Sequence, residues 1–313
     1  MMNDLFKNKN HLNFRFGLGG FYSLLMITMI IIGCGEKSND PLIIPPDRSI
    51  PPESELVEGV DYFLPKIDLN NWKVTLPIGN PSEVEPPTIL NYANNDLLKE
   101  FMYNDSTDGS LVFHTYPGST TANSSFSRTE LREQMVPGSN NVNWTFEQGG
   151  RMKGTLAMTE ISNDSGNNPH RVIIMQIHGR LTNAQRDLIG EDDNNAPPML
   201  KIYWEKGKVV VRTKELENLN ANATEILHTS AWGNADSYTF PESVDFDKFT
   251  LEVIVTSGRM EVILNESASK VYDDIHIQKW NVFENYFKAG NYLITSDEGA
   301  FSTLKYFDLE ITH

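Results

Sequence analysis

The sequence is poor in cysteine, in basic residues and in long apolar runs. Cys34 is the only cysteine, so no disulfide can form within the chain. Lys and Arg total 26 against 42 Asp and Glu, for a formal net charge of -16. Such a chain lacks the extended basic face that binding to nucleic acid requires, so we expect no nucleic-acid partner. A polyanionic ligand would have to meet positive charge gathered locally in a cleft.

Residues 1–34 have the pattern of a lipoprotein signal peptide. Basic residues precede an apolar run from Phe21 to Ile32, which is shorter than the ~20 apolar residues that cross a bilayer. Cys34 follows a small residue after this run and resembles the lipidated cysteine of a bacterial lipobox. We therefore expect lipidation at Cys34 and a membrane-anchored lipoprotein at the cell surface or in the periplasm. An ordinary signal peptide is the alternative.

The rest of the chain divides into a linker and one folded domain. Residues 35–60 are rich in proline and show no periodic pattern, which indicates an extended linker. Residues 61–313 alternate short β-type segments with Gly, Asn, Ser and Pro, which predicts a single all-β domain. The clearest hairpins turn at Ser257-Gly258 and at Lys206-Gly207.

Several finer expectations follow from the same pattern. The alternating stretches NWKVTLPIG near the start and LKYFDLEIT at the end suit first and last strands that lie side by side. Asn95–Glu100 and Ala184–Ile189 are two short helical candidates, and neither changes the all-β class.

The stretch VIIMQIH places two polar residues at the end of an apolar strand. Residues two apart in a strand share a face, so Ile173, Met175 and Ile177 are expected to line one face. The other face then carries Ile174 and turns polar at Gln176 and His178, as the floor of a concave sheet would. The alternative is a buried pair satisfied by each other or by backbone.

In the stretch SRTELREQM, the same alternation places charged residues on one face of a strand. Arg128, Glu130 and Arg132 fall on one strand face, so a carboxylate separates two guanidinium groups, which match carboxylate ligands in a bidentate way. In YFKAGNY, Tyr286 and Lys288 share a face, and a nearby cation makes a phenol more acidic and suits it to proton transfer. Taken singly, a solvated charged strand or an aromatic beside a lysine is commonly structural.

Together, the three stretches resemble the signature regions of the alginate lyases of polysaccharide lyase family seven. Those regions are an R-T/S-E-L-R strand, a Q-I-H or Q-V-H strand and a Y-F-K-A-G-N-Y strand, in this order. NWKVTLPIG also looks like the opening strand of that family. The resemblance implies a β-jelly-roll sandwich whose concave sheet forms a groove for an anionic polyuronate, alginate, which it cleaves by β-elimination.

The resemblance also assigns roles to residues. It implies Arg128, Gln176, His178 and Tyr286 as catalytic residues, with Tyr286 as the acid and either His178 or Tyr286 as the base. It implies substrate-binding or orienting roles for five more residues, namely Glu130, Arg132, Lys288, Asn291 and Tyr292. Ile177, between Gln176 and His178, is associated in the family with guluronate-containing substrate.

Other readings remain open at this point. The chain could act on another polyuronate such as a glucuronan, or it could be a surface jelly roll that captures glycan without cleaving it. We expect no metal or other cofactor, because Arg128 can neutralise the substrate carboxylate and residues 190–198 lack the spacing of a calcium loop. The long loop over 180–198 is expected to close one end of the groove. We also expect a monomer.

Overall fold

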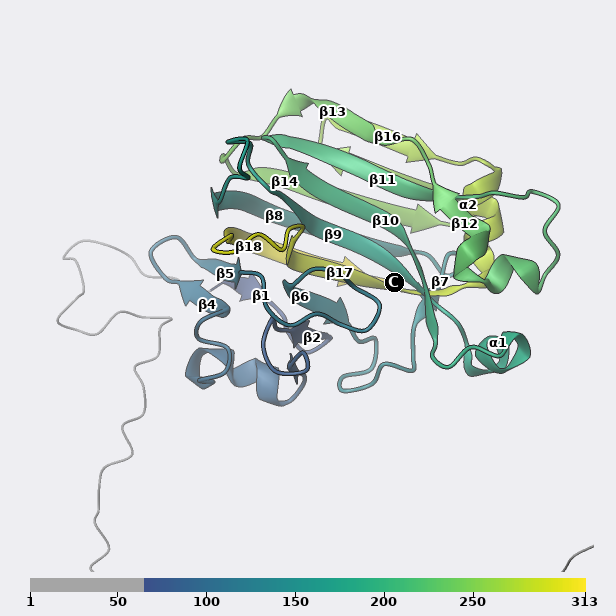
Figure 1. The fold of residues 1–313 in the computed structure, drawn as a ribbon, viewed down its shortest axis with the longest axis horizontal. Helices are drawn as coiled ribbons and strands as arrows, with labels where there is room; N and C mark the ends of the chain where they lie inside the picture. The colour runs from purple at the N-terminus through teal and green to yellow at the C-terminus, as the bar shows by residue number, and fades with distance from the viewer. Residues whose placement is uncertain (1–64) are drawn as a thin grey trace, which may run out of the picture. The chain divides into compact units, whose positions relative to one another are not determined.

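The computed structural model describes residues 65–313, so the expected signal peptide, the linker and Cys34 lie outside the described residues. Two large sheets form the fold and are stacked face to face (Figure 1). Nearly all strand pairs are antiparallel, with the β1–β18 pair parallel. The all-β jelly-roll sandwich expected from the sequence is confirmed. No helix of the described residues is long and apolar enough to cross a membrane.

The first sheet has eight strands in the order β16-β15-β14-β8-β18-β5-β4, with β1 beside β18. Their bounds are β1 Lys66–Ile67, β4 Met102–Asp105, β5 Ser110–Thr115, β8 Gly150–Ile161, β14 Phe249–Thr256, β15 Arg259–Leu264, β16 Ala268–Tyr272 and β18 Ser302–Thr312. The predicted hairpin at Ser257-Gly258 is confirmed as the β14–β15 pair.

The second sheet has ten strands, in the order β12-β11-β10-β9-β17-β6-β2-β3, with β13 beside β11 and β7 beside β17. Their bounds are β2 Trp72–Thr75, β3 Glu83–Val84, β6 Arg128–Glu133, β7 Trp144–Thr145, β9 Arg171–Arg180, β10 Asn195–Glu205, β11 Lys208–Leu216, β12 Trp232–Asn234, β13 Tyr238–Ser243 and β17 Glu284–Leu293. The hairpin at Lys206-Gly207 is confirmed as β10–β11.

Helices are short and peripheral. The α-helices are α1 Asn183–Ile189 and α2 Ile275–Lys279, and the 3-10 helices cover Thr88–Asn94, Glu225–Leu227, Thr229–Ala231 and Trp280–Val282. The helix expected at Ala184–Ile189 is therefore confirmed. It begins at a capping box, in which Thr182 and Gln185 satisfy each other's backbone groups, and it ends at Gly190 in the left-handed region. Asn95–Glu100 is not a helix; the 3-10 turns precede it.

The expected pairing of first and last strands is wrong in detail. The NWKVTLPIG stretch forms β2 in the ten-stranded sheet, where it pairs with β6, whereas the LKYFDLEIT stretch belongs to β18 in the eight-stranded sheet. β18 instead pairs with the two-residue strand β1. Alternation alone does not reveal which of two sheets a strand joins, because both sheets send one face to the same core.

The core lies between the sheets and is built from their inward residues. Large side chains such as Trp72, Phe113 and Phe287 are fully buried in it. A hydrogen bond also crosses the core. The Tyr306 hydroxyl, on β18 of the eight-stranded sheet, donates to the Ile174 carbonyl oxygen on β9 at 2.6 Å. The opposite face of the ten-stranded sheet is thereby left for the polar residues of the three sequence stretches.

Candidate active site

Three adjacent strands bring the predicted residues together. β17 lies between β6 and β9 in the ten-stranded sheet. The register places Tyr286 directly opposite His178, and Lys288 directly opposite Gln176 on one side and Arg132 on the other. Directly opposite side chains in a sheet are neighbours, so the three stretches form one cluster.

Glu130 is the centre of this cluster and is fully buried. Its carboxylate pairs with the Lys288 ammonium, accepts a hydrogen bond from Gln176 Nε2 at 2.5 Å and lies 3.3 Å from Arg128 Nη1. Burial alone would raise the pKa of Glu130, but the charges of Lys288 and Arg128 hold it below its ordinary value. Glu130 therefore stays ionised and orients three of the predicted residues from beneath.

His178 and Tyr286 stand side by side on this floor. Their ring centroids are 5.2 Å apart and the rings are 12° from parallel. His178 Nδ1 lies 2.9 Å from the Gly179 carbonyl oxygen, so a proton on Nδ1 would leave the lone pair of Nε2 free. Burial and the charge of Lys288 lower the pKa of His178 to about 3, and burial raises the pKa of Tyr286. The pair is thus a neutral imidazole beside a protonated phenol.

Arg128 faces a cavity of about 390 Å³ that Gln176, His178 and Tyr286 also line. Its guanidinium carbon lies 3.9 Å from the centroid of the Tyr292 ring, and its buried Nε has no hydrogen-bond partner. Tyr292 in turn shares a 2.6 Å hydrogen bond with Ser124. Arg128 is therefore held in place while keeping donor capacity for a ligand.

Arg132 is anchored differently. Its guanidinium donates to the Glu133 and Asn140 carbonyl oxygens and to Asn143 Oδ1, at 2.6, 3.2 and 2.9 Å. The guanidinium carbon lies 4.1 Å from the centroid of the Tyr286 ring, so its charge lies close to the phenol. Burial lowers the pKa of Arg132, although the group stays cationic at ordinary pH.

Three placements differ from the sequence-based expectations. Asn291 does not face the groove, because its Nδ2 donates to the Phe113 and Ser302 carbonyl oxygens in the eight-stranded sheet. The two-residue alternation already puts Asn291 on the core face, with Phe287 and Ala289, so the expectation that it binds substrate is wrong. Lys288 forms part of the floor and is absent from the lining of the cavities beside Tyr286.

The third difference is an irregularity in β9. The register shifts between Met175 and Ile173 in the pairing with β17 and also in the pairing with β10, so Ile174 and Met175 both enter the core. Ile173, expected in the core, instead packs with Tyr203 and Tyr292 on the groove face. Gln176 and His178 keep the expected face because they lie beyond the shift.

A second cavity of about 300 Å³ shares Tyr286, Asn123 and Asn195 with the first. Between the two, Asn123 Nδ2 donates to Asp193 Oδ2 at 3.1 Å. These residues belong to the segments before β6 and β10, which flank β17 and β9, so the contact bridges the groove. The 180–198 segment thus reaches over the middle of the groove, rather than closing one end.

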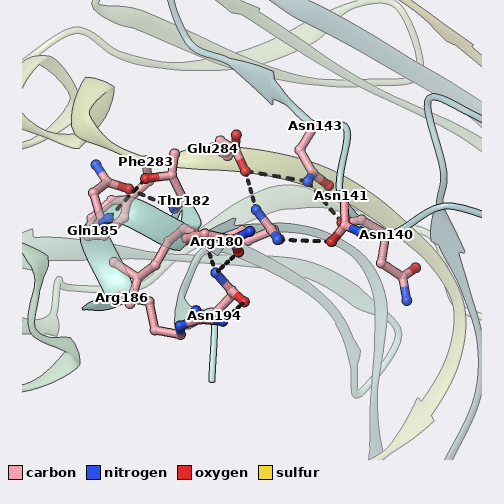
Figure 2. Close-up of polar contacts among 12 residues, drawn as sticks. Asn140, Asn141, Asn143, Arg180, Thr182, Gln185, Arg186, Asn194, Phe283 and Glu284 are labelled. Carbon is pink, nitrogen blue, oxygen red and sulfur yellow. Dashed lines mark hydrogen bonds and ion pairs between the residues drawn. The ribbon is translucent and has the colours of Figure 1, made fainter. Parts of the chain in front are cut away.

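The second cavity is also lined by Arg180, which was not among the residues predicted for the site. Its guanidinium donates to Glu284 Oε2 at 2.5 Å and to Asn141 Oδ1 at 3.3 Å. Figure 2 shows the guanidinium between these two residues. The ion pair ties the end of β9 to the start of β17. The alternation of side chains along a strand could have identified Arg180, because this residue shares a strand face with Gln176 and His178.

The strand register aligns one row of residues across the sheet. The row runs from β2 to β11 through Lys73, Arg132, Lys288, Gln176, Lys201 and Arg212. At ~4.8 Å between strands, five steps span about 24 Å. Five of the six residues are cationic in a chain of net charge -16, so positive charge is focused along one line of the groove. Within residues 65–313, no three His, Cys, Asp or Glu residues are grouped to hold a metal ion.

Comparison with known proteins agrees with this geometry. The alginate lyase family model matches residues 67–313. A substituted variant of family 7 alginate lyase A1-II′, solved with a substrate (GGMG), is 26% identical with a TM-score of 0.64, and the match covers 79% of this chain and 94% of that one. An alginate lyase from Pseudomonas aeruginosa shares the fold, at 22% identity, a TM-score of 0.58 and coverage of 79% and 100%.

No functionally curated protein matches the sequence. The family model nevertheless covers most of the chain and includes every strand of the site described above. This chain therefore belongs to the alginate lyase family and is a polysaccharide lyase.

Proposed function

We propose that the enzyme cleaves guluronate-containing alginate by β-elimination at the His178–Tyr286 pair. The reaction removes the proton at C5 of a uronate, next to the carboxylate, and expels the oxygen at C4. Removing that proton places a second negative charge beside the carboxylate, so the site must supply positive charge and hydrogen-bond donors there. The observation that carries the proposal is the neutral imidazole stacked beside a protonated phenol, above buried cations.

Arg128 and Gln176 are suited to hold the carboxylate of the reacting sugar. Both line the cavity beside His178, and Arg128 Nε is buried without a partner. Gln176 gives one amide proton to Glu130 and retains the other for a ligand. A guanidinium and an amide together neutralise the carboxylate and stabilise the enolate-like state that follows proton loss.

In this proposal His178 is the base and Tyr286 is the acid. The imidazole is already neutral with Nε2 free to accept the C5 proton, and the phenol is already protonated and can give its proton to the leaving oxygen. The carboxylate of a bound uronate adds negative charge and so raises the low pKa of His178, which strengthens the base. Where the C5 proton and C4 oxygen lie on one side of the sugar, Tyr286 alone could serve both steps.

The preference for guluronate rests on Ile177. Its side chain is fully buried in the core and does not face the groove, so any influence on the substrate must pass through the placement of Gln176 and His178. The test is ultraviolet absorbance of the unsaturated product, measured separately on polyguluronate, polymannuronate and a glucuronan. A faster rate on polyguluronate supports the proposal, and a faster rate on polymannuronate contradicts it.

A Tyr286→Phe variant tests whether the site acts by proton transfer. Loss of a general acid costs about 10²- to 10⁴-fold in rate, while the ring and the Arg132 contact remain. We expect kcat to fall by that factor with polymer binding retained. Tyr238→Phe, on β13, removes a hydroxyl outside the site and should leave the rate unchanged. A near-normal rate for Tyr286→Phe would refute the assigned role.

The N-terminal segment suggests where the enzyme works. We propose that Cys34 is lipidated and that the linker over 35–60 holds the catalytic domain away from a membrane, at the cell surface or in the periplasm. Labelling cells with a fatty acid should mark the wild-type chain, and a Cys34→Ser variant should lose the label. We also propose that the enzyme acts as a monomer, which light scattering of the purified domain would test.

A further inference from the structure

Glu133, at the end of β6, is a buried carboxylate that the proposed mechanism does not use. It is 1% exposed and shares the core face of the strand with Leu131, opposite the face that carries Arg132. Its Oε2 accepts hydrogen bonds from Trp144 Nε1 at 3.0 Å and from the Phe287 backbone N–H at 2.8 Å. A charge at this depth requires a partner of opposite sign, because a buried unpaired charge is costly.

The bond to Phe287 lies where β17 changes its partner strand. β7 pairs with the two residues before Tyr286, and β6 pairs with β17 from Lys288 onward. In the part of the chain that the structure describes, Tyr286 and Phe287 pair with neither of these strands, and the Glu133 carboxylate accepts the Phe287 N–H instead. The peptide group directly after the proposed acid is therefore held on this side by a side chain.

His313 supplies the opposite charge. Its Nε2 lies 2.5 Å from Glu133 Oε1, and its Nδ1 lies 3.2 Å from the Gly149 carbonyl oxygen. A carboxylate and a carbonyl only accept hydrogen bonds, so the ring satisfies both contacts with a proton on each nitrogen. Burial alone would lower the pKa of His313, but the hydrogen bond and the charge of Glu133 raise it above its ordinary value. His313 is therefore an imidazolium paired with the buried carboxylate.

Packing fixes the imidazole in this position. Its ring centroid lies 5.5 Å from that of Trp144 and 5.9 Å from that of Phe287, and the His313 side chain is 20% exposed. A Cβ added at Gly150 would lie 3.0 Å from His313 Nδ1, so the glycine leaves room for the ring. Among these neighbours on β6, β7, β8 and β17, Glu133 is the ionisable one.

Glu133 is linked to Tyr286 along two paths. Its side chain holds the peptide N–H that follows Tyr286. Its backbone carbonyl accepts a 2.6 Å bond from Arg132, whose guanidinium carbon lies 4.1 Å from the centroid of the Tyr286 ring. A general acid must lie within hydrogen-bond reach of the leaving oxygen, so a small displacement of β17 at this point changes the rate.

We propose that Glu133 and protonated His313 are positioning residues for the elimination: the carboxylate places Tyr286 through the Phe287 N–H, and His313 holds the carboxylate. Both act from the core side of the ten-stranded sheet, through Tyr286. The proposal rests on the proposed function, because it assumes that Tyr286 is the acid. It implies that His313, a residue beyond the end of β18, affects turnover rather than polymer binding.

The test compares His313→Ala and His313→Gln with the wild type on alginate polymer. Alanine leaves Glu133 without its partner, so we expect kcat to fall about 10- to 100-fold with KM within about twofold, because a displacement of ~1 Å costs about 10²-fold. Glutamine keeps an amide donor for the carboxylate, so His313→Gln should recover part of that loss. A purely structural role would not lower kcat selectively in a folded variant.

His114→Ala is the matched control. His114 is a half-buried histidine on β5 of the eight-stranded sheet, and its Nδ1 lies 3.0 Å from Thr303 Oγ1. The variant loses the same ring and should keep the wild-type kcat and KM. Kinetics are measured at a temperature at which thermal unfolding shows each variant to be folded. A folded His313→Ala with kcat within about twofold of the wild type refutes the proposal, and so does a change confined to KM.

A measurement on the wild type decides the case if His313→Ala does not fold. Nitrogen-15 NMR of ring-labelled histidine reports whether each ring nitrogen carries a proton, and the His313 signals are those missing from His313→Gln. At pH 7 both nitrogens of His313 should be protonated. If the wild type does not cleave alginate, the proposed function fails. An active wild type with a neutral His313 ring refutes the positioning pair alone.

Discussion

Replacement of Glu130 by glutamine removes the one carboxylate that the buried cluster shares. The side chain is 1% exposed and bonds to Lys288, Gln176 and Arg128. Glutamine has nearly the same shape, so the change removes charge with little loss of packing. It leaves two buried cations without their partner.

The expected magnitude follows from that loss. Breaking a buried ion pair by removing one partner costs about 3–5 kcal/mol. For a domain of this size each kcal/mol lowers the midpoint of thermal unfolding by about 2–4 °C, so Glu130→Gln should unfold about 6–20 °C below the wild type. Loosening Arg128 and Gln176 should also lower kcat, by about 10²-fold if either shifts by ~1 Å.

The deficit should depend on pH in a defined direction. Glu130 has a lowered pKa, so its contribution is present above the ordinary value of 4.5 and is lost as pH falls through the folded value. Burial lowers the pKa of Lys288 to about 8, so above that pH the ammonium deprotonates and the pair weakens in the wild type as well. The difference between wild type and variant should be largest between about pH 5 and pH 7.5.

The assay is thermal unfolding at pH 6.5 and pH 9.5, with Glu310→Gln as the control. Glu310 pairs with Arg151 at 2.6 Å, but its side chain is 52% exposed, and such pairs are worth about 0–1 kcal/mol. The reasoning is refuted if Glu130→Gln unfolds within the range of the control at pH 6.5. It is also refuted if the deficit grows at pH 9.5.

Two further predictions concern charge and access in the groove. Burial and the charge of Lys214 lower the pKa of Lys201 to about 8, so its charged form is disfavoured on folding; this penalty is complete below pH 8 and disappears above its ordinary pKa of 10.5. Lys201→Gln should therefore stabilise the domain at pH 7, by up to about 3 kcal/mol, and unchanged denaturant stability would contradict this. Asp193→Ala removes two exposed hydrogen bonds, from Asn123 and from the Asn195 backbone N–H, and should destabilise the domain by no more than about 1 kcal/mol. If the bridge limits entry, the variant should raise kcat/KM for polymer relative to short oligomers, and an unchanged ratio would show that it does not.

Much of the site could be predicted because a strand alternates its faces. The alternation places Arg128, Glu130 and Arg132 together, and Tyr286 with Lys288, and the structure confirms both groupings. The same rule fails at Ile173 and Ile174, because the register shift in β9 interrupts the period of two. Such irregularities depend on pairing with neighbouring strands and leave no mark on the local pattern.

Gly290 is a position where the residue type itself reflects the local backbone geometry. Its φ is +139°, and a Cβ at this position would lie 2.7 Å from the Thr129 carbonyl oxygen. The motif glycine therefore permits β17 to approach β6 at the residue opposite Glu130.

The direction of the groove could not be predicted, because it depends on register between strands that are distant in the sequence. Lys73, Arg132 and Lys201 belong to separate segments, and nothing in any one segment aligns it with the others. Once paired, they form a row that runs across the strands, two residues along β17 and β9 from Tyr286 and His178. A polyanion that follows this row would present successive carboxylates to successive strands. We therefore expect polymer binding to depend on chain length, because the sheet architecture lines up cations that belong to separate motifs and segments.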